Sequence, residues 1–427
     1  MSERELIACL EGEEMGRVRQ NGHARLQFTY AQTWLESGNA FPLSLSMPLQ
    51  NAPHPHSRID TFLWGLLPDN AAILQSWGRR FQVSPRNAFA LISHVGEDCA
   101  GAVQFLRPER GDVLRGKRGG EVAWLNEAEV GQRLRELRAD HAAWRTARDT
   151  GQFSLAGAQP KTALLFQDGR WGVPSGRLPT THILKPPNAR LDGFPENEHI
   201  CLRLAQSLGL PVAESRVMTF DGEVAIVITR YDRFLSAAGW QRIHQEDFCQ
   251  ALGVSPAKKY QSDGGPSARV ILELLRAYSS AAERDAATFI DALALSWLTG
   301  ATDAHAKNYS ILITSGEQIR LAPLYDIASV LPYAQFDVNR VKLAMRIGGK
   351  YRLREVGLRE WQKLASELKW DAEALVARVS EMAQAIPDLL AQIGAEARAA
   401  GLSHPVIERL IARLAGRSRL CATQLRS

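Results

Sequence analysis

The stretch TDAHAKNYS, Thr302 to Ser310, brings four chemically different side chains close together in the chain. Asp303 carries a carboxylate, His305 an imidazole, Lys307 an ammonium group and Asn308 a carboxamide. Because Asp and Asn are also frequent in turns, the composition of the stretch by itself is typical of a polar surface turn as well. The neighbouring elements are needed to distinguish a turn from a site that handles charge.

A predicted hairpin brings a second carboxylate to this stretch. In SILITSGEQIRLAP, two short apolar runs flank Ser315 and Gly316, which is typical of two antiparallel strands joined by a turn. If residues 310–314 pair with 319–323, the open ends of the hairpin lie side by side, and Asp326 comes close to Asp303 and Asn308. Two carboxylates and a carboxamide supply the oxygen ligands that suit Mg²⁺.

The spacing also points to phosphoryl transfer. Asp303 and Asn308 are separated as are the base and the metal-binding Asn of the protein-kinase catalytic loop. Asp326 then corresponds to the metal-binding Asp after the hairpin, although Asp-Ile-Ala stands in place of Asp-Phe-Gly. His305 and Lys307 are expected to be supporting groups, since a single His with no second His or Cys nearby is weak evidence for zinc.

Two segments are candidates for binding nucleotide phosphates. SLAGAQPKTALL, residues 154–165, is a loop of small residues whose backbone N–H groups could surround phosphate oxygens, but with Gly157 as its one glycine the spacing favours a plain turn. Lys185 ends the strand THILKPP, as the phosphate-binding strand lysine of protein kinases does; an ordinary edge lysine is the alternative. Glu198, in the helix that follows, is a candidate for orienting Lys185.

The remaining pattern predicts the elements that hold these residues. Residues 1–106 mix short strands with loops, and 107–121 form a basic loop or linker rich in Gly and Arg. Residues 122–144 look helical, whereas 161–174 read as two strands joined at Asp168 and Gly169. A helix over 195–210 and a strand over 222–233 follow. From 245 onward helical spacing dominates, over 287–302, 358–368, 371–386 and 405–420.

Composition sets the broad class. The chain has 427 residues, 45% hydrophobic and 23% charged, which suits two or three globular domains. The net charge of +5 is compatible with an anionic partner but does not require one. Five scattered cysteines form no CxxC pair, the N-terminus lacks a signal-peptide pattern and no apolar run reaches membrane-span length. We therefore expect a soluble cytoplasmic protein.

Taken in order, the motifs resemble those of a known family. SLAGAQPKTALL, THILKPP, NEHICLRLAQSLGL, RYDR, QEDFCQALG, KYQSDGGP, GATDAHAKNYSIL and LAPLYDIAS are similar to the HipA family of bacterial serine/threonine kinases, the toxins of HipBA-type toxin–antitoxin systems. GLLPDN and GEDCAGAVQFL resemble the N-terminal domain of that family, so the resemblance covers about residues 10–415.

The resemblance implies a role for each candidate residue. Asp303 would be the catalytic base, Asn308 and Asp326 the Mg²⁺ ligands, and Lys185 the lysine on the ATP phosphates. The loop would bind phosphate rather than form a plain turn, through Leu155, Ala156, Gly157, Ala158, Gln159 and Lys161. Ser154 would be the autophosphorylated serine, whose modification is associated in the family with loop displacement and loss of activity. A phosphate on this loop would repel those of ATP.

The resemblance also implies an adenine site and partners. Adenine would lie against a strand-to-helix connection at TRYDR and bind backbone groups from Thr229 to Tyr231; some relatives carry an acidic residue at the Thr229 position. No helix-turn-helix segment is evident, so operator DNA would be bound only indirectly, through a HipB-like helix-turn-helix antitoxin. The protein substrate is expected to be an aminoacyl-tRNA synthetase.

These observations combine into one architecture with open alternatives for its role. We expect an α+β, bilobal protein-kinase-like fold: an N-terminal subdomain (1–106), the basic loop (107–121), a strand-rich ATP-binding lobe (122–235) and an all-helical C-terminal lobe (236–427) with the catalytic loop. The expected function is an ATP- and Mg²⁺-dependent kinase acting as a growth-arresting toxin. A catalytically weak co-repressor partner of a DNA-binding antitoxin, and a small-molecule kinase, are the alternatives.

Overall fold

The computed structural model describes residues 4–110, 120–139, 154, 156–157, 159–188, 190–316 and 318–426. Leu155, Ala158 and residues 111–119 of the basic loop lie outside the described residues. The chain forms two compact units, each assembled from several segments. The first unit comprises residues 1–186, 218–257 and 310–319, and the second comprises 187–217, 258–309 and 320–427. The predicted boundaries at residues 106, 121 and 235 stay predictions.

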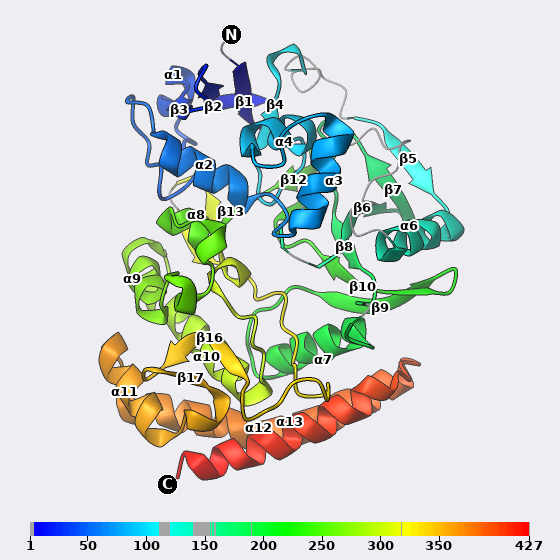
Figure 1. Cartoon of the computed structure of the whole chain (residues 1–427), viewed down its shortest axis with the longest axis vertical. Coiled ribbons are helices and arrows are strands. Elements are labelled where there is room, and N and C mark those ends of the chain that lie inside the picture. The colour runs from blue at the N-terminus through cyan, green and yellow to red at the C-terminus, as the bar shows by residue number, and fades with distance from the viewer. Residues whose placement is uncertain are drawn as a thin grey trace. The chain divides into compact units, whose positions relative to one another are not determined.

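The first unit begins with a four-stranded antiparallel sheet in the order β3-β2-β1-β4 (Figure 1). The strands are β1 (Arg4–Leu10), β2 (Glu13–Gln20), β3 (Leu26–Tyr30) and β4 (Gln104–Leu106). The helices between β3 and β4 are α1 (Gln32–Leu35), α2 (His56–Gly65), α3 (Ala71–Phe81) and α4 (Ala88–Val95). Asn70 and Asn87 cap α3 and α4 by accepting hydrogen bonds from backbone N–H groups of the first turn, which explains why both helices begin where they do.

A second sheet has six strands in the order β5-β7-β6-β8-β10-β9. They are β5 (Val122–Leu125), β6 (Thr162–Gln167), β7 (Arg170–Pro174), β8 (His182–Lys185), β9 (Ser215–Phe220) and β10 (Glu223–Thr229). The predicted β6–β7 hairpin is confirmed: Gln167 pairs with Arg170, and both turn residues, Asp168 and Gly169, have the positive φ that a two-residue hairpin turn requires.

The helical expectation for residues 122–144 is wrong at its start. The first four residues form β5, which pairs with β7, and the helix α6 (Glu127–Ala139) begins only afterwards. Val130 and Leu134 lie four positions apart on α6, so both point to one face, where they pack with Leu164, Leu184 and Val227 of the sheet. This packing holds the inner strands β6, β8 and β10 against a helix.

The segment after TRYDR also differs from expectation. Instead of a strand-to-helix connection, β10 is followed by the hairpin β11 (Arg233–Ser236) and β12 (Gly239–Arg242). Strand β13 (His244–Asp247) and helix α8 (Phe248–Leu252) come after that hairpin. Each of these strands has only four residues, which is too short for alternation of apolar and polar residues to predict a strand.

The predicted hairpin after the catalytic-loop stretch is confirmed. Strands β14 (Ser310–Thr314) and β15 (Gln318–Leu321) are neighbours in a three-stranded sheet in the order β13-β14-β15. Gly316 adopts a φ of 73°, a turn conformation that suits glycine. The pairing of Asp247 with Ser310 anchors the hairpin at the end that adjoins the stretch.

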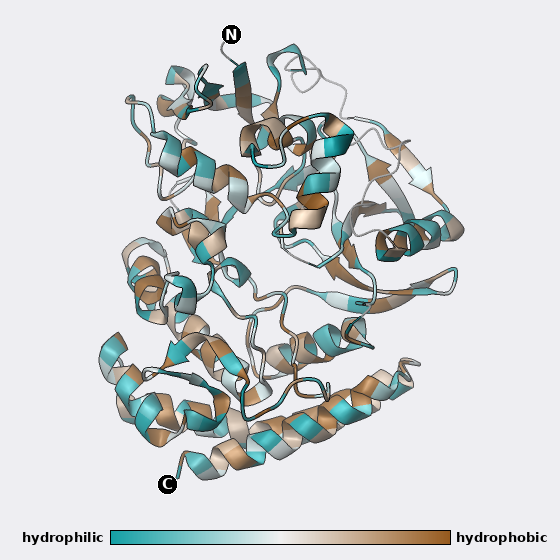
Figure 2. Cartoon of the chain, viewed as in Figure 1, coloured by the Kyte–Doolittle hydropathy of each residue, from teal (hydrophilic) through white to brown (hydrophobic). Residues whose placement is uncertain are grey.

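The second unit is mainly helical (Figures 1 and 2). Its helices are α7 (Phe194–Ser207), α9 (Ala268–Tyr278), α10 (Ala282–Thr299), α11 (Leu358–Leu368), α12 (Ala372–Ala399) and α13 (Pro405–Gln424). Brown and teal alternate around α12 and α13 in Figure 2, as expected for amphipathic helices. The expected all-helical lobe also carries a two-stranded sheet, β16 (Lys342–Ile347) and β17 (Lys350–Arg352), that the sequence reading missed.

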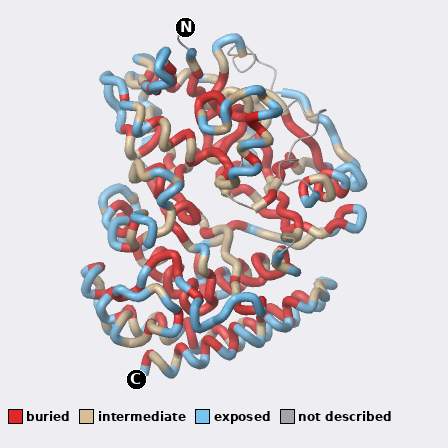
Figure 3. Tube along the Cα trace, viewed as in Figure 1, coloured by how far each residue is buried: buried red, intermediate tan, exposed pale blue. Residues whose placement is uncertain are grey.

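The core of the second unit is built on α10. Most of this helix is buried, as its colour in Figure 3 shows, and Trp297 stacks edge-to-face on Trp361 of α11 with ring centroids 5.6 Å apart. The Arg417 guanidinium lies over the same indole and donates to the Trp297 carbonyl. Gly300 ends α10 in the left-handed conformation, so the chain turns into the catalytic-loop stretch at a fixed point. None of the described helices is long and apolar enough to cross a bilayer.

A buried glutamate in the first unit gives the fold a pH dependence. Glu246 on β13 is 1% exposed, and its Oε1 accepts a hydrogen bond from the Leu45 N–H at 2.8 Å. Burial raises the pKa of Glu246 to about 8, because the charged form is poorly solvated there. Glu246 is therefore protonated in the folded protein at neutral pH but ionised in the unfolded chain.

We predict that folding stability falls as pH rises from 4.5 to about 8, because unfolding releases the Glu246 proton over that range. The slope contributed by this residue is about 1.4 kcal/mol per pH unit. Glu246→Gln should remove this slope and raise the denaturation midpoint at pH 8, measured by urea titration between pH 5 and 8.5. Glu13→Gln, at an exposed position, is the control. An unchanged slope in Glu246→Gln would show that Glu246 is ionised in the folded state.

Candidate functional site

The predicted catalytic loop in the second unit is closed by its own backbone. The His305 N–H and the Asn308 side-chain Nδ2 both donate to the Asp303 carbonyl, at 2.8 and 2.7 Å, and the Asn308 N–H donates to the His305 carbonyl. Asn308 therefore donates through Nδ2, which leaves Oδ1 as its metal-ligand atom. The loop holds Asp303 and Asn308 in one fixed arrangement.

The Asp303 carboxylate is accessible although its surroundings are buried. Its side chain is 62% exposed, whereas that of His305 is 3% exposed. The Tyr260 hydroxyl donates a hydrogen bond to Asp303 Oδ1, and His305 Nε2 lies 3.6 Å from the same oxygen. The Tyr260 and His305 rings pack edge-to-face at 4.9 Å. One carboxylate oxygen is thus oriented by neighbours while the group as a whole can reach an external hydroxyl.

The structure brings Asp326 to the same region of the second unit. The hydroxyl of Tyr325, its neighbour, donates to the Lys307 carbonyl at 2.9 Å. Leu324 is bridged to the backbone around Val212, and Ser329 donates through Oγ to the Thr299 carbonyl. Asp326 itself has a φ of 58°, in the left-handed region that non-glycine residues rarely adopt. Asp adopts this region more often than most residues do, and Asp168 and Asp221 share it in turns of the first unit.

Helix α7 is tied to this metal-ligand segment. The Asn197 side chain both donates to the Ser329 carbonyl, at 2.7 Å, and accepts from the Ser329 N–H, at 3.0 Å. Glu198, the next residue, is fully buried. Glu198 is a site residue predicted from the sequence, whereas Asn197, its neighbour in the motif NEHIC, was not predicted. Asn197 could have been recognised because a polar residue on the buried face of a helix needs a hydrogen-bond partner there.

The predicted phosphate-binding loop lies in the first unit, against the motif GLLPDN. Ser154 is completely buried, and its Oγ donates to the Leu66 carbonyl at 2.8 Å. The Gly157 carbonyl accepts from the Asp69 N–H at 3.1 Å, so the loop is attached at two points, Ser154 and Gly157. The N-terminal subdomain predicted from sequence therefore contributes the surface on which this loop rests.

Gly157 and Lys161 fix the shape of the loop. Gly157 has a φ of 104°, a backbone conformation that strains any residue with a side chain, and a Cβ there would also displace the Lys161 ammonium group. Lys161 Nζ donates to the Ala156 carbonyl at 2.7 Å. Gln159 is half-buried. Among the described residues of the loop, the Lys161 ammonium group thus ties the two ends together.

Lys185 ends an inner strand of the six-stranded sheet. Strand β8 lies between β6 and β10, and Lys185 pairs with Ile226, so the edge-lysine alternative is wrong. Thr229 ends β10 opposite His182, and Tyr231 follows it; both are half-buried. The structure therefore places Lys185 and Thr229 on adjacent strands of the first unit, with Tyr231 in the turn after β10.

A buried ion cluster connects these parts of the first unit, and the sequence reading missed it. The Asp98 carboxylate accepts from the Thr180 N–H and hydroxyl, at 3.0 and 2.7 Å, and from Arg233 at 2.9 Å. The Asp98 carbonyl accepts from the Ser154 N–H at 3.0 Å. Asp98 thus joins the phosphate-binding loop, the start of β8 and the segment after β10.

Opposite charges lie next to each other in this cluster, which holds three guanidinium groups and two carboxylates. Arg230, Arg233 and Arg242 surround Asp98, and Asp232 accepts from Arg230 at 2.8 Å. Burial by itself would raise the pKa of Asp98, but the guanidinium groups, that of Arg233 first, outweigh it and hold this pKa well below its usual range. The sequence shows Asp98 in GEDCAG and the charged residues of RYDR, but no sequence pattern indicates that these two motifs meet.

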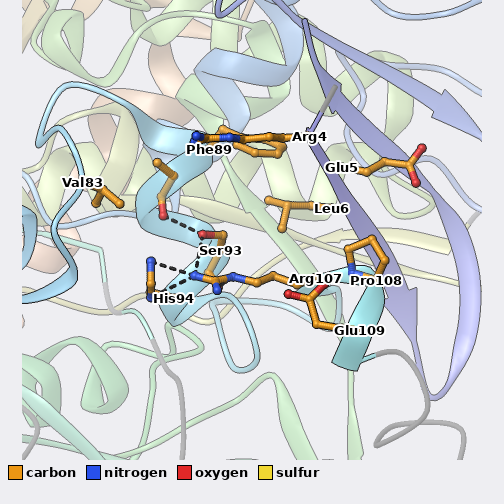
Figure 4. A pocket seen from close by; sticks show the side chains of 11 residues that line it. Arg4, Glu5, Leu6, Val83, Phe89, Ser93, His94, Arg107, Pro108 and Glu109 are labelled. Carbon is orange, nitrogen blue, oxygen red and sulfur yellow. Dashed lines mark hydrogen bonds between the residues drawn. The ribbon is translucent and has the colours of Figure 1, made fainter. Parts of the chain in front are cut away.

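A pocket of about 650 Å³ also lies in the first unit, away from all these residues (Figure 4). Its lining includes Leu6, Phe89 and Arg107, and Arg107 donates to the side chains of Ser93 and His94. Figure 4 shows the Arg107 guanidinium turned toward Ser93 and His94, with dashed lines for these hydrogen bonds. None of the predicted site residues lines it.

The donor set in the second unit fits a magnesium ion. Carboxylate and carboxamide oxygens are its preferred protein ligands, and Asn308 and Asp326 supply one of each on segments joined by the Tyr325–Lys307 hydrogen bond. Among the described residues, no group of three or more His, Cys, Asp or Glu side chains forms a different metal cluster. The assignments of individual residues to base, ligand and phosphate contact remain predictions.

We predict that Asp98→Asn disrupts the first unit strongly. The variant keeps the size of the side chain but removes an anion from among buried guanidinium groups, which should cost about 3–5 kcal/mol of unfolding free energy. The same change at Asp221, whose ion pair with Arg135 is exposed, should cost less than about 1 kcal/mol. Urea titration of both variants measures the difference. Equal losses would contradict a special role for Asp98.

Comparisons with known proteins agree with this architecture. Residues 6–106 match the HipA N-terminal domain and residues 153–390 the HipA-like C-terminal domain. The chain is 36% identical to "Putative kinase Y4mE" of Sinorhizobium fredii over 98% of this chain and 99% of that protein. It is 31% identical to the "Serine/threonine-protein kinase toxin HipA" of Shewanella oneidensis over 85% of this chain and 83% of that protein.

The solved structures include a similar protein as well. The HipA, HipB and operator DNA complex of Shewanella oneidensis contains a chain that matches with a TM-score of 0.82 and 25% identity, over 99% of this chain and 98% of that one. The α+β, protein-kinase-like fold expected from the sequence is confirmed by this match. With two family domains matched in order and a relative aligned along nearly its whole length, the chain belongs to the HipA family.

Proposed function

We propose that this protein is an ATP- and Mg²⁺-dependent protein serine/threonine kinase that acts as a growth-arresting toxin. The family membership supports kinase chemistry in general, because the relatives are named as kinases. The observation that carries the proposal for this chain is the joined set of Asp303, Asn308 and Asp326, held together by backbone hydrogen bonds and by Tyr325. A reaction that draws on ATP belongs in the cytoplasm, where we place it.

Asp303 is proposed as the base that accepts the proton of the acceptor hydroxyl. That oxygen attacks the γ-phosphorus of ATP, the bond to the β-phosphate oxygen breaks, and ADP leaves. The exposed carboxylate with one oxygen oriented by Tyr260 supports this role. Asn308 and Asp326 would hold Mg²⁺, which neutralises the charge of the phosphates when bound.

The nucleotide would be held by groups of the first unit. Backbone N–H groups of the loop from Leu155 to Lys161 are the proposed phosphate donors, and Lys185 the proposed cation. Thr229 and Tyr231 are the proposed backbone contacts to adenine. Glu198, His305 and Lys307 are proposed as supporting groups, in keeping with the burial of all three.

We also propose a helix-turn-helix antitoxin as the partner that neutralises the protein. The similar Shewanella oneidensis structure contains HipB and operator DNA together with HipA. A co-repressor role alongside such an antitoxin is the second candidate function, and it is compatible with kinase activity. An aminoacyl-tRNA synthetase stays the predicted acceptor protein.

The decisive test is phosphate transfer from labelled ATP with Mg²⁺, to the protein itself and to proteins of a lysate. Asp303→Asn should reduce transfer by at least about 10²-fold, because the base is lost. Asp326→Asn should do the same. Asp388→Asn, on the exposed face of α12, is the matched control and should leave transfer unchanged. Full transfer by Asp303→Asn would contradict the proposed mechanism, and no transfer by the wild type with intact ATP binding would favour the co-repressor role.

Ser154 gives a second prediction. Its hydroxyl is buried and hydrogen-bonded to Leu66, so the loop must leave its docked position before the hydroxyl can accept a phosphate. Phosphate adds about −1.5 to −2 charge, which this buried position cannot solvate. Phosphorylated protein, or Ser154→Glu, should bind ATP at least about tenfold more weakly than wild type. Ser154→Ala loses one hydrogen bond and should keep ATP binding; isothermal titration compares them. Equal affinity of all forms would show that the loop tolerates the charge.

A further inference from the structure

The segment after the metal-ligand residues carries an unusual charge distribution. Residues 340–354, here called the basic hairpin, comprise β16, β17 and their flanking residues. The segment contains six basic residues and no acidic one: Arg340, Lys342, Arg346, Lys350, Arg352 and Arg354. The rest of the chain carries 45 basic against 46 acidic residues, so the whole net positive charge of the protein resides in this segment.

All six side chains are exposed. Because they carry the same charge and lie on one short segment, they repel one another. The apolar residues of β16 are buried, whereas its two cations, Lys342 and Arg346, are exposed. Lys342 pairs directly with Arg352 across the two strands, and like charges in opposite positions destabilise a sheet. A surface selected only for solubility would alternate its charges.

Few carboxylates compensate these cations. Arg340 lies 3.5 Å from Asp337, and Arg352 donates to Glu355 at 3.3 Å. The other four have no ion-pair partner among the residues that the structure describes. An uncompensated group of cations on one short sheet is complementary to an anionic partner.

The basic hairpin is connected to the candidate base within the second unit. The Arg346 N–H donates to the Gln261 side chain at 2.9 Å. The residue before Gln261 is Tyr260, whose hydroxyl binds Asp303. The Lys259 carbonyl accepts from the Ala306 N–H of the catalytic loop. Two short steps through side chains therefore lead from the hairpin to the carboxylate that would meet the acceptor hydroxyl.

We propose that the basic hairpin is a docking surface for an acidic segment of the protein substrate, flanking the hydroxyl that receives the phosphate. This inference rests on the proposed kinase function and specifies the substrate class for it. A protein segment is favoured over nucleic acid because the neighbouring carboxylate would act on a protein hydroxyl. The hairpin also has a single aromatic residue, Tyr351, and that residue is half-buried, whereas stacking on unpaired bases uses exposed rings.

The test measures binding directly and does not depend on catalysis. Full-length Asp303→Ala protein is titrated against three fluorescent probes of equal length, followed by anisotropy: a serine peptide flanked by glutamates, the same peptide flanked by glutamines, and single-stranded RNA. We expect the acidic peptide to bind about tenfold more tightly than the neutral one at low salt, with the difference decreasing as salt is added. Equal affinity for the two peptides overturns the proposal, and tighter binding of RNA overturns it in favour of a nucleic acid.

Charge reversal locates the surface. In the same background, Arg346→Glu with Lys350→Glu should abolish the preference for the acidic peptide. Arg409→Glu with Arg413→Glu, two exposed arginines one turn apart on α13, makes the same charge change elsewhere in the second unit and should preserve the preference. Loss of the preference in both double variants would mean that only net charge matters, and its retention in both would exclude the hairpin.

Phosphate transfer to the two peptides by the Asp303-intact protein separates this proposal from the proposed function. Transfer to both peptides at equal rates leaves the kinase function standing and overturns the docking role. A preference in binding without transfer to any peptide or protein supports the surface and removes the kinase function.

Discussion

The first unit depends on the burial of Asp98 among arginine side chains. Moving a carboxylate and several guanidinium groups out of water is unfavourable unless each finds its partners, and here the partners come from segments far apart in the chain. The loop at Ser154, the start of β8 and the segment after β10 are held by one residue, so none can shift alone. The geometry of the proposed nucleotide site is therefore set by a residue of the N-terminal subdomain that would touch no nucleotide.

Local patterns predicted much of this molecule. The β6–β7 and β14–β15 hairpins, the Lys185 strand and the long helices follow from alternation, turn residues and helical spacing, all of which act within a few residues. The four-residue strands β5 and β11 were missed because so short a run carries no period and pairing partners decide its state. The Asp98 cluster was missed for another reason: its charges are up to 144 residues apart, and no local rule pairs them.

The candidate site residues also divide into those that a local pattern connects and those that only distant contacts bring together. Asp303, Asn308 and Asp326 could be associated because one hairpin connects them, and the hydrogen bond between Tyr325 and Lys307 is in keeping with that reasoning. Tyr260 binds Asp303, and Asn197 binds the backbone of Ser329, three residues after Asp326; neither was singled out from the sequence, because both come from distant segments. Residues that could bind or react are recognisable by type, whereas residues that hold them in position are recognisable only after folding.

The burial of Ser154 has a consequence for timing. The Ser154 hydroxyl is buried while the loop is docked, so it cannot receive a phosphate in that conformation. If the docked loop is also the one that binds ATP productively, a molecule could not transfer phosphate to an acceptor and be modified at Ser154 in the same conformation. Each molecule would then stay active for an interval set by how often the loop opens, independent of how much acceptor protein surrounds it. If the protein is the self-phosphorylating kinase proposed above, a substitution in GLLPDN that shifts the Leu66 carbonyl away from Ser154 would change how long each molecule stays active rather than how fast it transfers phosphate.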